Sequence, residues 1–163
     1  MNYDTPPTEV LNLIEKVMED YHPDLAANDV KVEAIFAITD EKPLKSGGYP
    51  AMAFIKINSL KLRIKGMKDA EITLDKSVWD NLNDQARVAL IDHELTHLQI
   101  ATDKEGNVKY DDANRPKLKM RRHDYQMGWF REVALRHGEY SPERVQAQIL
   151  MKEDGDTFFG QKI

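Results

Sequence analysis

The sequence of 163 residues predicts an α+β fold organised as a single domain, 1–163. Apolar residues recur at helical spacing close to the N-terminus and again after residue 83, and the segment between them carries short alternating patterns that are typical of strands. The chain shows no internal repeat and no linker-like stretch. With 41% hydrophobic residues it can fill one core, so we expect a small twisted sheet packed against helices.

The first helix is predicted over 8–21. Apolar residues recur at helical spacing from Val10 to Tyr21, and Pro23 stops the pattern because proline cannot continue a helix. Residues 30–38 then begin as an alternation and become continuously apolar, which favours a strand covered on both faces at its end.

Two further strand patterns follow a glycine-containing loop. Residues 54–65 interleave apolar and basic side chains, which predicts a strand or a strand pair bent near Asn58-Ser59. Residues 70–75 predict a short alternating strand. The sheet is therefore expected to have about three or four strands.

The longest helical pattern is predicted over 84–101, after a short helical turn at 77–82. Asn83 and Asp84 are favourable N-cap residues for it. One apolar stripe runs along the pattern and contains Val88, Ile91, Leu95 and Leu98. The polar, turn-rich segment 103–117 that follows is predicted to be a long surface loop or a small excursion.

Two helices are predicted in the last third of the chain. One starts near His123 and ends at Gly138. The other begins at Ser141-Pro142, an N-cap followed by proline at the first helical position, and runs through Lys152.

The composition excludes several classes of protein. The sequence has no cysteine, which excludes disulfides, thiolate nucleophiles, iron–sulfur clusters and cysteine zinc ribbons, so a metal would need nitrogen and oxygen ligands. The longest uncharged apolar run, 51–55, is far too short to span a bilayer, and the N-terminus lacks the order of a signal peptide. We therefore expect a cytoplasmic protein without a membrane partner.

The longest predicted helix carries the motif His93-Glu94-Leu95-Thr96-His97, which has the form H-E-x-x-H. Histidines four positions apart project from adjacent turns of one face, so both imidazoles can reach the same Zn2+ at about 2.0–2.1 Å and leave a position open for water. The alternative is a solvated helix face with two ordinary histidines. His93, Glu94 and His97 flank the apolar stripe instead of interrupting it, which favours the metal site.

Glu94 lies inside the motif, and Asp92 and Asp124 are each next to a candidate histidine ligand. The Glu94 carboxylate can bind the water on the metal, take its proton as the water attacks a carbonyl, and pass that proton to the leaving amine. Asp92 points away from His93 on a helix, so we expect it to face solvent or to cap nearby backbone. Asp124 is equally consistent with a hydrogen-bond partner of a ligand and with a helix cap.

Two histidines leave the coordination sphere incomplete, so a third protein ligand should come from elsewhere. The candidates are His123, His137, Asp124, Glu132 and the pair Asp111-Asp112. We favour His123, because it stands at the predicted start of a helix, after a loop long enough to fold back over the motif helix. His137, in a last helical turn, and His22, before a proline, are better explained as structural residues.

Three groups of residues form a pattern that covers about 8–140. They are Tyr21-His22-Pro23-Asp24-Leu25, then Trp79 and Leu82 before the segment 85–97, and then His123-Asp124 followed by Phe130 and Gly138. In this pattern the sequence resembles the putative phage metallopeptidases, which are similar in outline to SprT-like and other minimal zincins. The combination of H-E-x-x-H with a downstream His-Asp pair is more specific than the metal motif alone.

The resemblance implies a zincin-like minimal metallopeptidase domain, in which a small twisted sheet packs on the helix that carries H-E-x-x-H. It implies His93, His97 and His123 as metal ligands, Glu94 as catalytic base, and a phage or prophage gene product in the bacterial host cytoplasm. This chain departs from the family pattern at 125–127, where it has no acidic residue after the His-Asp pair, so no role of those acids carries over.

Two other segments have competing interpretations. Strand 70–75 resembles the zincin edge strand to which an extended peptide can add, although an ordinary sheet strand is equally consistent. The basic residues within 115–122 allow a contact with nucleic acid. The chain is net acidic, however, which favours a solvated segment paired with Asp111-Asp112.

The sequence thus predicts zinc-dependent hydrolysis of a peptide or protein substrate, with Zn2+ as the cofactor, Glu94 as base, and His93, His97 and His123 as ligands. The alternative is a binding or anti-defence protein in which zinc only staples a small fold, without turnover. An intact Glu94 favours the enzyme, because a structural site needs ligands but no base and is normally closed by four protein ligands.

Overall fold

The structure is a computed structural model that describes residues 1–123, 131–140, 142, 147–148 and 151. By its contacts the chain divides into two units, Met1–Arg122 and His123–Ile163, and each is described by itself. No helix among the described residues is long and apolar enough to cross a membrane. The prediction of a single domain over 1–163 stays a prediction.

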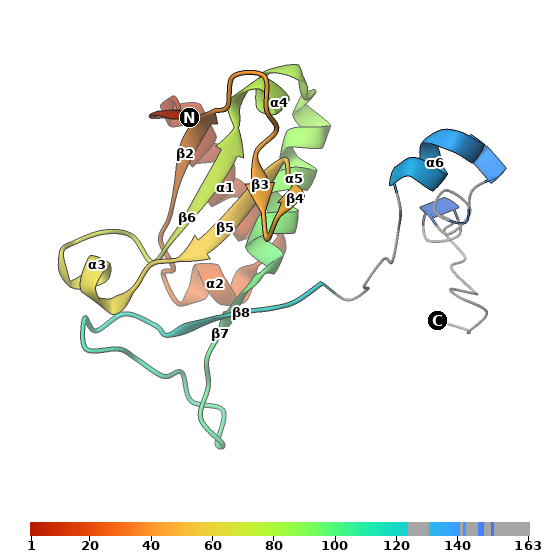
Figure 1. Cartoon of the computed structure of the whole chain (residues 1–163). Helices are drawn as coiled ribbons and strands as arrows, with labels where there is room; N and C mark the ends of the chain where they lie inside the picture. The colour runs from red at the N-terminus through yellow and green to blue at the C-terminus, as the bar shows by residue number, and fades with distance from the viewer. Residues whose placement is uncertain (124–130, 141, 143–146, 149–150, 152–163) are drawn as a thin grey trace. The chain divides into compact units, whose positions relative to one another are not determined.

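A four-stranded mixed sheet forms the centre of the first unit (Figure 1). Its order is β1 (Asn2–Asp4), β2 (Val32–Ile38), β6 (Ala70–Asp75) and β5 (Ala53–Ile57). β2 and β6 are parallel, whereas β1 and β5 pair antiparallel with their neighbours. The predicted α+β class and the strands at 30–38 and 70–75 are confirmed.

Helices α1 (Thr8–Tyr21) and α5 (Asp84–Thr96) cover one face of this sheet (Figure 1). Their apolar stripes meet the inward side chains of the strands in one core, which holds Ile14, Val17, Ile72, Leu74, Ile91 and Leu95 at its most buried positions. Short helices α2 (Pro23–Ala27) and α4 (Lys76–Asn81) follow α1 and β6. The predicted helix at 8–21 and the predicted turn at 77–82 are therefore confirmed.

The helix that carries the H-E-x-x-H motif begins where the sequence predicts and ends earlier. The Asn83 side chain caps it by accepting a hydrogen bond from the Ala86 backbone N–H at 2.8 Å. The prediction that it continues to residue 101 was wrong, because Leu98–Ile100 form strand β7 and pair antiparallel with β8 (Leu118–Met120). Leu98 still enters the core, which explains why its position fits a helical stripe.

Residues 98–120 form one hairpin, here called the return hairpin. Isolated bridges join Thr102 to Val108 and Tyr110 to Pro116, so the predicted excursion at 103–117 extends the β7–β8 pairing through two turns. Backbone bonds run from Ala101 N–H to Lys117 O, from Lys117 N–H to Lys109 O, and from Lys109 N–H to Ala101 O. The segments around Ala101, Lys109 and Lys117 are therefore hydrogen-bonded to one another.

The second half of the predicted strand 54–65 is a helix. Ser59 accepts from the Leu62 N–H and starts α3 (Leu60–Ile64), so only β5 matches the strand prediction. The alternation of apolar and basic residues misled the prediction because the Arg63 guanidinium is buried, donating to the carbonyl oxygens of Asn58 and Pro116.

A small hairpin lies before β5. Its strands β3 (Lys45–Ser46) and β4 (Tyr49–Pro50) are joined by Gly47 and Gly48, which have φ values of 56° and 86°. Both values lie in the left-handed region that glycine adopts without strain, and consecutive positive φ angles are typical of tight hairpin turns.

In the second unit, α6 (Arg131–His137) is followed by a short 3-10 helix, η1 (Gly138–Tyr140). This confirms the end of the predicted helix near Gly138. His123 itself is not helical, and the rest of the predicted helical start, 124–130, lies outside the described residues. The predicted helix 141–152 also falls mostly outside them, and Pro142, Ala147 and Gln148 are helical.

Asp75 links the end of β6 to α4 and provides a test of the fold. Burial would raise the pKa of its carboxyl, but hydrogen bonds from Ser77, Leu44 and Val78 outweigh burial and lower the pKa below its ordinary value of 3.8. Asp75→Ala should lower the free energy of unfolding by about 2 kcal/mol at pH 7. Urea unfolding monitored by circular dichroism measures this change.

The same substitution should have a defined pH dependence. A carboxyl whose pKa is lowered by folding stabilises the protein above its unfolded pKa, and this stabilisation is lost as pH falls through the folded pKa. The gap between wild type and Asp75→Ala should therefore narrow as pH drops below about 3.8. Asp80→Ala, an exposed aspartate of the same helix, is the control. Equal losses in the two variants would contradict the role of Asp75.

Candidate metal centre

The C-terminal end of α5 carries the three motif residues, directly before the return hairpin. His93 is exposed, Glu94 is buried with 4% of its surface accessible, and His97 is half-buried at the helix C-cap. The His93 and His97 rings meet edge to face, with 5.2 Å between centroids. This is the arrangement expected for histidines four positions apart on one helix face.

Three histidines could hold a metal ion: His93, His97 and His123. One nitrogen from each ring lies within 4.8 Å of the others. A tetrahedral site with bonds of about 2.0–2.1 Å places its ligand atoms about 3.4 Å apart, so modest ring rotations would close the set. The structure thus brings together the three residues that the sequence predicts, and their role as ligands stays a prediction.

A pair of hydrogen bonds with Arg121 holds His97 in place. The ring atom Nδ1 lies 2.7 Å from the Arg121 carbonyl oxygen, and the Arg121 backbone N–H donates to the His97 carbonyl oxygen. Because a carbonyl can only accept, Nδ1 must carry the proton, and a neutral ring then has its lone pair on Nε2. Histidine ligands of metals commonly donate their other N–H in this way.

The Glu94 carboxylate lies against strand β5. Burial raises its pKa above the ordinary value of 4.5, while the nearby His97 and a hydrogen bond from the Ile55 N–H partly oppose the rise. The Met52 carbonyl accepts from the Asp75 N–H at the end of β6, and the Asn58 N–H donates to the carbonyl of Asp69, directly before β6. Because backbone groups alternate in direction along an antiparallel pair, the Ile55 N–H points away from β6. Glu94 therefore lies at the outer edge of β5.

Of the two interpretations of strand 70–75, the structure supports the ordinary sheet strand and not the edge strand. This strand is β6, which lies between β2 and β5 in the sheet. The edge-strand interpretation rested on sequence order, because 70–75 closely precedes the motif helix. The strand beside Glu94 is instead the earlier segment Ala53–Ile57. The edge of the sheet next to the motif helix is β5.

A residue that sequence reasoning treated as merely structural also braces α5. His22 Nε2 lies 2.7 Å from Asp92 Oδ1, and the two side chains are 13% and 41% exposed. Asp92 is therefore partly exposed, as expected, and it also binds a histidine 70 positions away, which the sequence did not predict. The prediction for Asp124 lies outside the described residues.

The basic cluster is partly absorbed by the fold. The Arg115 side chain pairs with Asp69 at 2.7 Å and approaches Asp29 at 3.7 Å, while its backbone N–H donates to the Asp111 carboxylate at 3.0 Å, so the predicted pairing of this segment with Asp111-Asp112 holds for the backbone of Arg115 only. The Asp111 carboxylate also pairs with Arg63 at 2.7 Å, which makes it a poor third ligand. The ion-pair partners lie 46 or more positions away in sequence, so local charge patterns did not reveal them.

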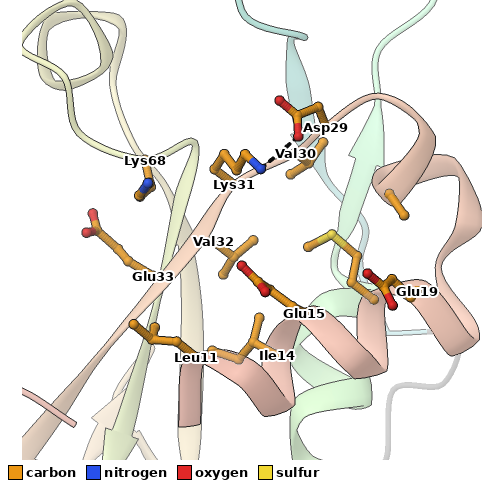
Figure 2. A pocket seen from close by; sticks show the side chains of 12 residues that line it. Leu11, Ile14, Glu15, Glu19, Asp29, Val30, Lys31, Val32, Glu33 and Lys68 are labelled. Atoms are coloured by element: carbon orange, nitrogen blue, oxygen red, sulfur yellow. Dashed lines mark ion pairs between the residues drawn. The ribbon is translucent and has the colours of Figure 1, made fainter. Parts of the chain in front are cut away.

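A groove elsewhere in the first unit is separate from these histidines. A cavity of about 390 Å³ opens between α1 and β2, where Leu11, Ile14 and Val32 lie near Glu15 and Glu33 (Figure 2). No histidine lines it. The candidate metal centre is therefore not part of this cavity. The cavity lies beside α1, whereas His93 and His97 lie at the end of α5.

Comparison with known proteins identifies the family. A family model described as putative phage metallopeptidase matches residues 2–152. The chain belongs to this family. The recognition made from sequence is therefore confirmed, and the family's description indicates a metal-dependent hydrolase of peptide bonds. No curated protein and no solved structure matches the chain.

In this phage metallopeptidase family member, the His22–Asp92 hydrogen bond should stabilise the motif helix. His22→Ala should lower the free energy of unfolding by about 1 kcal/mol in metal-free protein, because a partly buried, charge-assisted hydrogen bond is lost. A double-mutant cycle with Asp92→Ala isolates the pair. A coupling energy near zero would show that the contact contributes nothing to α5.

Proposed function

We propose that the protein is a zinc-dependent metallopeptidase with a zincin-like fold. The observation that carries the proposal is the convergence of His93, His97 and His123 beside the buried Glu94 carboxylate, in a chain of this family. Three protein ligands leave a fourth position open, as in catalytic zinc sites, whereas structural zinc sites are normally closed by four ligands.

The donor set fits zinc. Imidazole nitrogens are borderline ligands that suit Zn2+, and the hydrogen bond from His97 Nδ1 to the Arg121 carbonyl leaves Nε2 as the ring nitrogen that would bind a metal. The chain has no cysteine, so soft thiolate sites are excluded. When bound, zinc would supply the Lewis acidity that polarises the scissile carbonyl and lowers the pKa of water.

Glu94 is the proposed general base. Its burial raises the pKa of the carboxyl above the ordinary value of 4.5, which makes the carboxylate a stronger base than an exposed one. It would accept the proton of the attacking water at a carboxylate oxygen and deliver that proton to the leaving amine nitrogen. The hydrogen bond from the Ile55 N–H would keep the carboxylate in one orientation.

The substrate is proposed to be a peptide in extended conformation, added to the outer edge of β5. The N–H and C=O groups of Ala53, Ile55 and Ile57 alternate with those that bond to β6, so they point away from the sheet. Since the Ile55 N–H donates to Glu94, an added strand would pair with the remaining outward groups and pass beside that carboxylate. Main-chain pairing of this kind binds a peptide without requiring a particular sequence.

Metal binding is the first test. We expect one Zn2+ per chain, bound more weakly as pH falls through the histidine range, because the ligands must be neutral. His123→Ala should weaken zinc affinity by orders of magnitude, while His137→Ala on α6 should leave it nearly unchanged. Competition against a chromophoric chelator measures both affinities, with elemental analysis for stoichiometry. The reverse ranking of the variants would overturn the assignment of His123.

Hydrolysis is the second test. Glu94→Gln should keep zinc affinity and fold but lose nearly all peptide cleavage, because the amide has the same shape and cannot accept a proton. Cleavage of a broad peptide library, analysed by mass spectrometry, provides the measurement. Cleavage by Glu94→Gln at the wild-type rate would show that Glu94 is not the base. Bound zinc without cleavage of any peptide would favour the alternative, a zinc-stapled binding or anti-defence protein.

A further inference from the structure

We propose that Arg115 and Arg63 are positioning residues for the metal centre: they clamp the return hairpin to the body of the domain, and the hairpin in turn holds the His97 ring. This inference rests on the proposed function for its consequence in metal binding. Neither guanidinium belongs to the histidine cluster, so each would act through the hairpin.

The return hairpin has few contacts of its own with the core. β7 and β8 pair over three residues each, and of their side chains only Leu98 is fully buried, with Ile100 and Leu118 packed against the core. A two-stranded hairpin is marginally stable in water without further support. Its position relative to α5 therefore requires anchors elsewhere along its length.

Arg115 provides the first anchor, at the second turn of the hairpin. Its Nε and Nη2 donate to the two carboxylate oxygens of Asp69 at 3.1 and 2.7 Å, and Nη2 also donates to the Asp29 carbonyl oxygen. Asp69 is 2% exposed and accepts a further bond from the Lys31 N–H. Figure 2 shows Asp29 beside Lys31 at the turn that leads into β2.

Arg63 provides the second anchor, on the same turn. From α3 it donates to the Asp111 carboxylate at 2.7 Å and to the Pro116 carbonyl oxygen at 3.1 Å, while its Nε donates to Asn58 O. The Arg63 and Asp111 side chains are only 4% and 8% exposed. Both arginines thus hold the hairpin through directional bonds, which are buried at Arg63 and partly exposed at Arg115.

The hairpin transmits this position to His97. The β7–β8 register pairs Leu98 with Met120, and the next pair outward is His97 with Arg121. These two residues exchange the Arg121 N–H to His97 O bond and the His97 Nδ1 to Arg121 O contact. A shift of β8 by even one residue would remove the acceptor that fixes the tautomer and orientation of the ring.

The experiment compares Arg115→Lys with wild type in zinc affinity. Lysine keeps the positive charge but cannot form the two-pronged bond to Asp69 while also reaching the Asp29 carbonyl. We expect zinc affinity to fall about tenfold or more, as for other groups that orient a metal ligand. Measurements are made by chelator competition at a temperature where circular dichroism shows both proteins folded.

The control is Arg87→Lys. Arg87 also donates to a backbone carbonyl, that of Trp79, and stacks on the Trp79 ring, but it contacts α4 and not the hairpin. This variant should lose stability without losing zinc affinity. Zinc affinity of Arg115→Lys within twofold of wild type, at reduced unfolding stability, would overturn the proposal, because Arg115 would then be structural only.

A second readout needs no metal and separates this inference from the proposed function. In wild-type protein, 15N NMR of the histidine rings should show His97 protonated at Nδ1, and Arg115→Lys should lose that signature. If wild type binds no zinc but the signature changes, the function fails and the clamp stands. If Arg115→Lys does not fold, Asp69→Asn replaces it, since asparagine keeps an acceptor for the Lys31 N–H. An unchanged tautomer in the folded variant would contradict the proposal.

Discussion

The candidate centre depends on one constraint, the end of α5 directly after the motif. If the helix continued, the His97 carbonyl oxygen would accept a bond from the N–H four residues later, at Ala101. Because the helix ends at Thr96, that oxygen accepts from the Arg121 N–H instead, and Ala101 bonds to Lys117. Because the helix ends early, His97 lies between α5 and the strand pair β7–β8 and is bonded to both.

His93 and His97 are held by different means. His93 is held by the helix, which packs on the sheet and is braced through Asp92 by His22. His97 is held by the helix and by β8 together. His123 follows Arg121 by two residues in the sequence, and one nitrogen of its ring lies within 4.8 Å of those of His93 and His97. The three histidines of the cluster thus all come from the segment 93–123.

Sequence patterns predicted the parts of the fold that short-range physics decides. The amphipathic stripe of α1, the alternation of β6 and the cap at Asn83 depend on neighbours within a turn or a strand. The end of α5 and the helix α3 were mispredicted because long-range bonds decide them. Arg63 reaches Asp111 across 48 positions, and no local pattern marks it as a buried residue. The pair His93 and His97 was predicted because its spacing is a local property, whereas His123 was favoured for its place after the 103–117 segment and by the family resemblance.

The ion pairs of Arg115 and Arg63 are better explained by the single position that they give the return hairpin than by a gain in stability. Removing a guanidinium and a carboxylate from water costs free energy that their attraction only partly returns, so an apolar pair of similar volume could be as stable. Apolar contact is non-directional, however, and would allow the hairpin to slide along the sheet. Arg115 instead joins the Asp69 carboxylate to the Asp29 carbonyl, and Arg63 on α3 binds both the Asp111 carboxylate and the Pro116 carbonyl of the hairpin. Bonds of fixed direction at four acceptors admit one register of β8, and His97 needs that register.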